Sequence, residues 1–141
     1  MRFTITIIAL LFSFACTDHS LPCTANEGLW REKVEIKIPL GHTVCDPGTQ
    51  TGIRFARLIS DSRCPANVDC VTAGNAEVLL EIYQDKTVLD SFELTTQAPV
   101  KEVLLDGKHL TFKLLQVNPY PEYSEERQNV KYNILLEIDP E

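Results

Sequence analysis

Apolar and polar side chains alternate along most of this chain after residue 33. Between Val34 and Ile38, for example, the apolar Val34, Ile36 and Ile38 are separated by the charged Glu35 and Lys37. Successive side chains of a strand point to opposite faces, so a period of two predicts a strand with one buried face. No segment after residue 33 keeps the period of an amphipathic helix. We therefore expect strands at 34–38, 52–59, 76–82, 88–94, 100–105, 109–117 and 132–138.

Turn-forming residues separate these segments at Asp46-Pro47-Gly48, Gln84-Asp85-Lys86, Gln97-Ala98-Pro99 and Asp106-Gly107. The last of these lies between two apolar runs and predicts a tight two-residue hairpin, because both turn positions require positive φ. Segment 52–59 breaks the alternation, since Arg57 shares the parity of Ile53 and Phe55, and we expect a bulge or an edge position there. About seven short strands at this spacing predict an all-β fold, a single antiparallel β-sandwich or small barrel.

Residues 1–15 form a different kind of segment, in which the positive Arg2 precedes an uncharged apolar run over residues 3–15. This is the layout of a secretory signal peptide, and the run is shorter than the roughly 20 residues with which a helix crosses a bilayer. The run ends in Ser13-Phe14-Ala15-Cys16, and a polar string follows. This arrangement resembles a bacterial lipoprotein signal, in which the cysteine after the cleavage site carries the lipid.

Lipoprotein signals usually have an aliphatic residue at the position of Ser13, so two alternatives stay open. Ordinary signal peptidase would release a soluble protein that begins at Cys16, and an uncleaved segment would act as an anchor. In the leading interpretation the chain consists of a signal peptide (1–15), a polar tether (16–30) without periodicity and a β-sandwich domain (31–141). The protein is then exported and attached to the cell membrane or the outer membrane, facing the periplasm or the exterior.

The chain has five cysteines, and their number supports the same interpretation. If Cys16 carries lipid, an even number remains in an oxidising compartment, where cysteines form disulfide bonds. Three connectivities are possible, and closeness in sequence favours Cys64 with Cys70, which leaves Cys23 with Cys45. Each bridge would stabilise the fold by about 2–4 kcal/mol. Zinc is less well supported, because Cys64 and Cys70 lie further apart than the cysteines of zinc motifs and no histidine is near.

Composition and charge exclude some classes of function. The chain has 13 basic and 20 acidic side chains and a net charge of −7. Nucleic-acid binding is not expected, because phosphate contacts need a basic face. With 44% hydrophobic and 23% charged residues, the chain belongs to the folded class rather than the disordered one. The histidines have no metal or catalytic spacing, and no nucleophile elbow or phosphate-binding loop occurs, so we expect no enzyme, no metal and no cofactor.

The least generic stretch of the chain is segment 61–74, which reads DSRCPANVDCVTAG. It resembles a family of small secreted bacterial proteins, many of them lipoproteins, that share Asp-Ser-Arg-Cys-Pro, four residues, Cys, two residues and Ala-Gly. Members often have Trp where this chain has Thr72. The family has no known activity, so the resemblance implies an exported location and a similar fold and leaves the function open. The matching residues here are Asp61, Ser62, Arg63, Cys64, Pro65, Cys70, Ala73 and Gly74.

The sequence contains two candidate binding elements, Arg63 and the loop over residues 118–130. Arg63 either pairs with Asp61, Asp69 or another carboxylate and holds its loop in place, or protrudes as an anchor for a partner. The loop over residues 118–130 carries Tyr120 and Tyr123, which either bind a partner or cover an open end of the sandwich.

The leading hypothesis is a lipid-anchored, non-catalytic β-sandwich module of the bacterial cell envelope that binds an envelope protein or a glycan. The main alternative is an inhibitor of a secreted hydrolase, a protease or a lysozyme, that uses the disulfide-closed loop 61–74 as a preorganised plug. The third is an enzyme of unknown type, such as a hydrolase with two carboxylates from distant strands.

Overall fold

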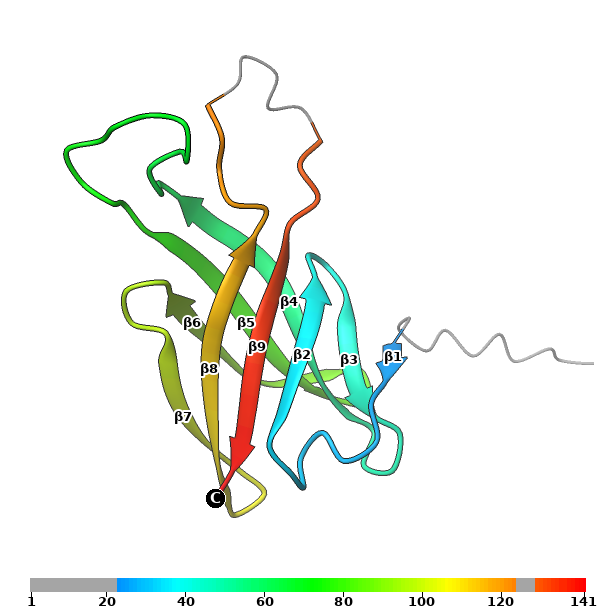
Figure 1. The fold of residues 1–141 in the computed structure, drawn as a ribbon. Coiled ribbons are helices and arrows are strands. Elements are labelled where there is room, and N and C mark those ends of the chain that lie inside the picture. The colour runs from blue at the N-terminus through cyan, green and yellow to red at the C-terminus, as the bar shows by residue number, and fades with distance from the viewer. Residues whose placement is uncertain (1–22, 124–128) are drawn as a thin grey trace, which may run out of the picture.

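The computed structural model describes residues 23–123 and 129–141. The predicted signal peptide, the candidate lipidation site Cys16 and the first part of the predicted tether lie outside the described residues. The described chain is all-β (Figure 1). Its strands are β1 (Cys23–Ala25), β2 (Val34–Pro39), β3 (Thr43–Asp46), β4 (Thr51–Asp61), β5 (Ala76–Gln84), β6 (Thr87–Thr95), β7 (Val100–Leu105), β8 (Lys108–Asn118) and β9 (Asn133–Pro140).

These strands form two sheets that pack face to face as a sandwich (Figure 1). One sheet has the order β1-β3-β4-β5-β6, and the other has the order β2-β9-β8-β7. All neighbours are antiparallel except β1 and β3, which are parallel. The predicted all-β sandwich is therefore confirmed. No helix among residues 23–123 and 129–141 is long and apolar enough to cross a membrane.

All seven predicted strands are present, and the structure adds β1 and β3. With three and four residues, these two strands are too short to show an alternating pattern. The predicted tether over 16–30 is wrong from residue 23 onward. Leu29 and Trp30 are buried in the core, and the Trp30 indole N–H donates to the Thr51 carbonyl at 3.2 Å. The domain therefore includes the segment before residue 31.

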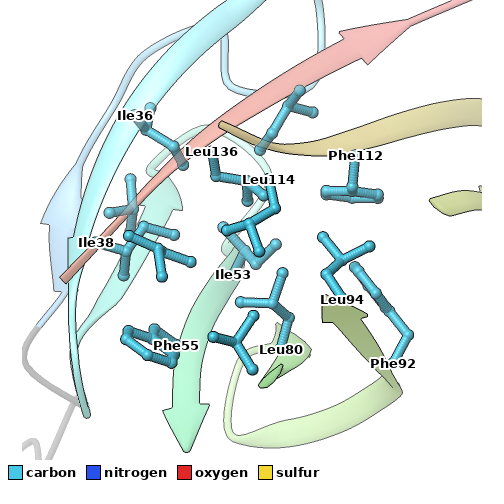
Figure 2. Packing of buried hydrophobic residues seen from close by; sticks show 14 of the residues in the cluster. Ile36, Ile38, Ile53, Phe55, Leu80, Phe92, Leu94, Phe112, Leu114 and Leu136 are labelled. Carbon is cyan, nitrogen blue, oxygen red and sulfur yellow. The ribbon is translucent and has the colours of Figure 1, made fainter. Parts of the chain in front are cut away.

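The core lies between the two sheets and consists of the inward positions of the alternating strands (Figure 2). On β5, Val78, Leu80 and Ile82 are fully buried, as the period of two predicts. Rings from the two sheets meet in this core, where the Phe92 and Phe112 centroids are 5.0 Å apart. Trp30 packs edge-on against Phe112 at 6.4 Å. Burial of these inner faces is the main favourable contribution to folding.

Irregularities in the strands occur where the sequence pattern breaks. Of the two alternatives for segment 52–59, the bulge is confirmed, since the pairing of β4 with β5 shifts between Phe55 and Arg57 and again near Leu58. The edge position is wrong, because β4 lies between β3 and β5. The predicted hairpin at Asp106-Gly107 is also confirmed, with φ angles of 49° and 76°. A further shift, between Leu114 and Gln116 of β8, was not predicted. This shift lies near the end of β8, just before the loop that connects β8 to β9.

Both predicted disulfides are present. Cys23 is bonded to Cys45 with a Cα–Cα distance of 6.0 Å, and Cys64 is bonded to Cys70 with a distance of 5.9 Å. The first bridge ties β1 to β3, and the second closes the connection between β4 and β5. Disulfides persist in oxidising compartments, so the two bridges are compatible with an exported protein.

Candidate functional site

Two long connections meet at one end of the sandwich, the loop between β4 and β5 and the loop between β8 and β9 (Figure 1). Three of the hydrogen bonds that join them involve Ala66 and Asn67. The Ala66 amide donates to the Pro121 carbonyl at 2.9 Å. The Asn67 side-chain amide donates to the Tyr123 carbonyl at 3.1 Å, and its oxygen accepts from the Tyr123 amide at 2.7 Å. The structure thus brings together the two segments that the sequence identified separately.

The buried side chain of Arg63 also connects the two loops. Its Nε and Nη2 donate to the two carboxylate oxygens of Asp61, each at 2.8 Å. Its Nη1 donates to the Val117 carbonyl at 2.6 Å, and Nη2 also donates to the Pro119 carbonyl at 3.0 Å. Arg63 is only 8% exposed. The interpretation that Arg63 pairs with Asp61 and holds the loop is confirmed, and the interpretation that it protrudes as an anchor is wrong.

The ion pair between Arg63 and Asp61 is buried, with side-chain exposures of 7% and 6%. Burial alone would raise the pKa of Asp61, but the hydrogen bonds and the charge of Arg63 outweigh it and hold that pKa below its ordinary value. In turn, the hydrogen bonds to Asp61 raise the pKa of Arg63. The Tyr132 hydroxyl donates to Asp61 at 3.4 Å and adds to the same effect. The pair stays ionised and has no net charge.

The loop between β4 and β5 is braced along its own length. Besides the Cys64–Cys70 disulfide, the Cys64 amide donates to the Ala73 carbonyl at 2.8 Å, and the Ser62 amide donates to the Asn75 carbonyl at 2.7 Å. Gly74 has a φ of +69°, and a Cβ there would overlap the Ser62 carbonyl oxygen. Glycine is therefore required where the two arms of the loop cross.

A third segment, the turn between β6 and β7, also belongs to this junction, and the sequence identified it only as a turn. The Thr96 hydroxyl donates to the Asn75 side-chain oxygen at 2.9 Å. The Gln97 side-chain amide donates to the Gly74 carbonyl at 3.3 Å. We call residues 62–75, 95–99 and 118–123 together the loop end.

Several large side chains of the loop end are exposed. Tyr120 and Tyr123 are 52% and 67% exposed, while Pro121 between them is buried. The tyrosine side chains therefore face outward, whereas Pro121 points inward. The guanidinium carbon of Arg63 lies 4.9 Å from the centroid of the Tyr120 ring and supports it by a cation–π contact. Val71, which directly follows Cys70, is fully exposed.

A hollow of about 570 Å³ opens beside Tyr120, between the two loops, the turn of residues 95–99 and the end of β8. Arg63 and Tyr120 are the only predicted site residues that line it. The polar side chains Gln97, Gln116 and Asn118 were missed, because no motif marks them and they come together only in the fold. The lining residues are Arg63, Ala73, Gly74, Thr96, Gln97, Leu115, Gln116, Val117, Asn118 and Tyr120.

A second hollow, of about 400 Å³, lies on the outer face of the five-stranded sheet beside the Cys23–Cys45 disulfide. Its floor is Gly52, where a Cβ would come within 2.8 Å of the Val44 carbonyl oxygen. The Tyr83 ring lines it, and burial together with the hydrogen bond to Glu81 raises the pKa of Tyr83. No three His, Cys, Asp or Glu side chains in the described part of the chain are grouped so that they could hold a metal ion.

The comparisons with known proteins assign no family. No family model matches this chain, and neither a curated protein nor a solved structure is significantly similar to it.

Proposed function

We propose that this protein is a lipid-anchored, non-catalytic module of the bacterial cell envelope that binds a protein or glycan partner through its loop end. The observation that carries the proposal is the rigid presentation of exposed rings. A disulfide, a buried ion pair and hydrogen bonds between loops fix the backbone under Tyr120 and Tyr123, yet both rings face solvent. Preorganised aromatic side chains bind with little loss of conformational entropy.

The anchor is supported by the lipoprotein-like sequence around Cys16 and by the short distance along the chain to the domain. Only six residues, 17–22, separate Cys16 from Cys23, where β1 begins. Even fully extended, they reach about 25 Å. A lipid on Cys16 would therefore hold the domain close to the membrane surface, within reach of envelope components.

Metabolic labelling with an alkyne fatty acid tests the anchor. In the producing cell, the full chain should take up the label, and Cys16→Ala should not. Globomycin, which blocks the lipoprotein signal peptidase, should cause the uncleaved precursor to accumulate. An unlabelled wild-type protein, or a labelled Cys16→Ala variant, would contradict lipidation at this cysteine and favour ordinary secretion.

Site-specific photocrosslinking tests the binding surface. A benzophenone amino acid placed at Tyr123 of the full chain should give a discrete adduct in intact cells. The same group at Asp106, in the turn at the opposite end of the sandwich, is the matched control and should give none (Figure 1). Digestion of the adduct by proteases or by glycoside hydrolases identifies the class of partner. Equal labelling at both positions, or none at Tyr123, would contradict the proposed surface.

The exposed Val71 favours a second candidate, an inhibitor of a secreted protease or lysozyme. Because Arg63 is buried, the plug would be the exposed apolar side chain of Val71, which directly follows Cys70 of the disulfide. Such a loop should inhibit at micromolar concentration, and Val71→Asp should abolish the inhibition while Asp106→Asn leaves it unchanged. Failure of the wild type to inhibit a panel of secreted proteases and lysozymes would remove this candidate. That the protein is not an enzyme stays a prediction.

A further inference from the structure

We infer that the hollow beside Tyr120 binds a neutral oligosaccharide, as a chain of uncharged pyranose rings. This inference rests on the proposed function and specifies the ligand class of the loop end. It is carried by the charge, the hydrogen-bonding groups and the shape of the residues that line the hollow.

The first observation is that the hollow is electrically neutral. Of its ten lining residues only Arg63 is charged. Both carboxylate oxygens of Asp61 accept hydrogen bonds from this guanidinium, so its charge is compensated within the protein. An anionic ligand would find no uncompensated positive charge there, and a cationic one would find no carboxylate in the lining. The lining therefore favours a ligand without charge.

The second observation is the set of hydrogen-bonding groups. The Asn118 side-chain amide donates to the Gln116 side-chain oxygen at 3.3 Å. The Gln116 side-chain N–H groups and the Asn118 side-chain oxygen have no partners among the described residues. Gln97 uses one N–H for Gly74 and keeps its oxygen. Arg63 uses four of its five N–H groups, and the fifth has no partner in the described part of the chain. Donors and acceptors thus occur together, which suits sugar hydroxyls, because each hydroxyl both donates and accepts.

The third observation is an aromatic wall. The Tyr120 ring has Arg63 against one side and is 52% exposed overall, so part of the ring faces the solvent beside the hollow. The apolar C–H face of a pyranose stacks on such a ring while its equatorial hydroxyls reach the surrounding amides. A volume of about 570 Å³ lies within the range of ligand sites and has room for one or two sugar rings.

The fourth observation is that hydrogen bonds within the protein already hold the three segments around the hollow in place before a ligand binds. Gly74 receives a hydrogen bond from Gln97, Asn75 receives one from Thr96, and Arg63 fixes the backbone of residues 117–119. A ligand would not have to order these segments on binding. Tyr123 does not line the hollow, which separates this site from the outer surface of the loop end.

Titration of the full exported chain with defined tetrasaccharides tests the inference. The probes are cellotetraose, maltotetraose, mannotetraose and tetra-N-acetylchitotetraose, with tetragalacturonate as the charged control. At least one neutral probe should bind at or below millimolar concentration and should shift the backbone NMR signals of Gly74, Gln97 and Gln116. Tyr120→Ala should weaken binding by about tenfold, the loss of one aromatic contact. Gln116→Ala should weaken it by about threefold, the loss of one hydrogen bond.

Two matched variants separate recognition from structure. Tyr120→Phe keeps the ring over Arg63 and should retain most of the affinity, and Tyr123→Ala should change it by less than twofold. No binding of any neutral probe, stronger binding of tetragalacturonate, or unchanged affinity in Tyr120→Ala would overturn the inference. If photocrosslinking at Tyr123 still gives an adduct in that case, the proposed function stands with a protein partner. If it gives none, the proposed function fails as well.

Discussion

At the scale of single residues, Asp61 and Arg63 show how one buried ion pair organises a surface. A buried pair is not strongly stabilising in itself, but removing one partner leaves an uncompensated charge. Here the guanidinium also donates to the carbonyls of Val117 and Pro119, so it joins loops more than fifty residues apart in sequence. The main role of the pair is therefore to position the loop that carries Tyr120.

Asp61→Asn should make the stability of the protein less dependent on pH in the acid range. The pKa of Asp61 is held below its ordinary value of 3.8, so its stabilisation is present above that value and lost as pH falls through the lower pKa of the folded state. Asp61→Asn should cost about 3 kcal/mol near neutral pH, because Arg63 stays buried and charged. The difference from wild type should shrink below about pH 4.

Urea unfolding of the oxidised protein over this pH range measures the effect. Asp106→Asn is the matched control, because Asp106 lies in an exposed turn, and it should follow the wild-type profile. A difference between wild type and Asp61→Asn that stays constant down to the most acidic pH would contradict the assigned ion pair.

Gly74→Ala and Gly107→Ala should differ in their effects, although both glycines have positive φ. At Gly107, nothing lies within 4 Å of the position of a Cβ, so alanine there should cost only about 1 kcal/mol of backbone strain. At Gly74 the methyl group would overlap the Ser62 carbonyl, and the loop crossing would have to open. We expect a cost of about 3 kcal/mol or more. Thermal unfolding of the two variants makes the comparison, and equal costs would show that the loop arms are not packed as described.

At the scale of elements, the two disulfides have different roles. The Cys23–Cys45 bridge closes a sequence separation of 22 residues and holds β1 on β3, whereas the Cys64–Cys70 bridge closes a separation of 6 within one loop. In the chain-entropy description, the stabilisation grows with the length of the closed segment, to about 3 kcal/mol for the first bridge and about 2 kcal/mol for the second.

Replacing each pair of cysteines by serine should therefore separate stability from binding. The variant without Cys23 and Cys45 should lose more stability and keep crosslinking at Tyr123. The variant without Cys64 and Cys70 should lose less stability but should also lose much of the crosslinking, because Asn67 no longer has a fixed position from which to bond to Tyr123. Denaturant unfolding and the photocrosslinking experiment provide the two measurements. The opposite ranking in either of them would contradict these roles.

The regular elements were predictable because their alternation is long enough to define a face. β5 and β9 show the expected inward rows, and the irregular β4 has the bulges that its broken parity indicated. β1 and β3 were missed because neither extends beyond two periods of the pattern. Because residues 16–30 were predicted to form a tether, Trp30 was not expected in the core. Its burial depends on β4, which it contacts only in the folded chain.

At the scale of the whole molecule, both sheets share one core. The chain has a single tryptophan, Trp30, which precedes β2 in one sheet, bonds to Thr51 in the other and packs against Phe112. Its fluorescence should therefore follow the unfolding of the entire domain. We expect the fluorescence and the far-ultraviolet circular dichroism transitions to share one midpoint. Two separated midpoints would show that the sheets unfold independently.

Phe112→Ala should shift both transitions together. Phe112 is fully buried between Trp30 and Phe92, and its truncation should cost about 3–5 kcal/mol. His109→Ala, at an exposed position of the same strand, should change stability by less than about 0.5 kcal/mol. Denaturant unfolding of both variants, followed by the same two signals, provides the measurement. A loss confined to one signal would contradict the single core.

The sequence by itself determined the class of fold, the faces of the long strands and the tight hairpin at Asp106-Gly107, and it favoured the disulfide pairs that the structure contains. These properties depend on local alternation, on turn residues and on cysteine spacing, all of which are written along the chain. Only the tertiary structure decided that Arg63 is buried, that Tyr120 and Tyr123 face outward and that Gln97 and Gln116 line one hollow. The physical reason is that these residues come from loops and strand ends with no periodicity, and what places them is their hydrogen bonds to segments distant in sequence.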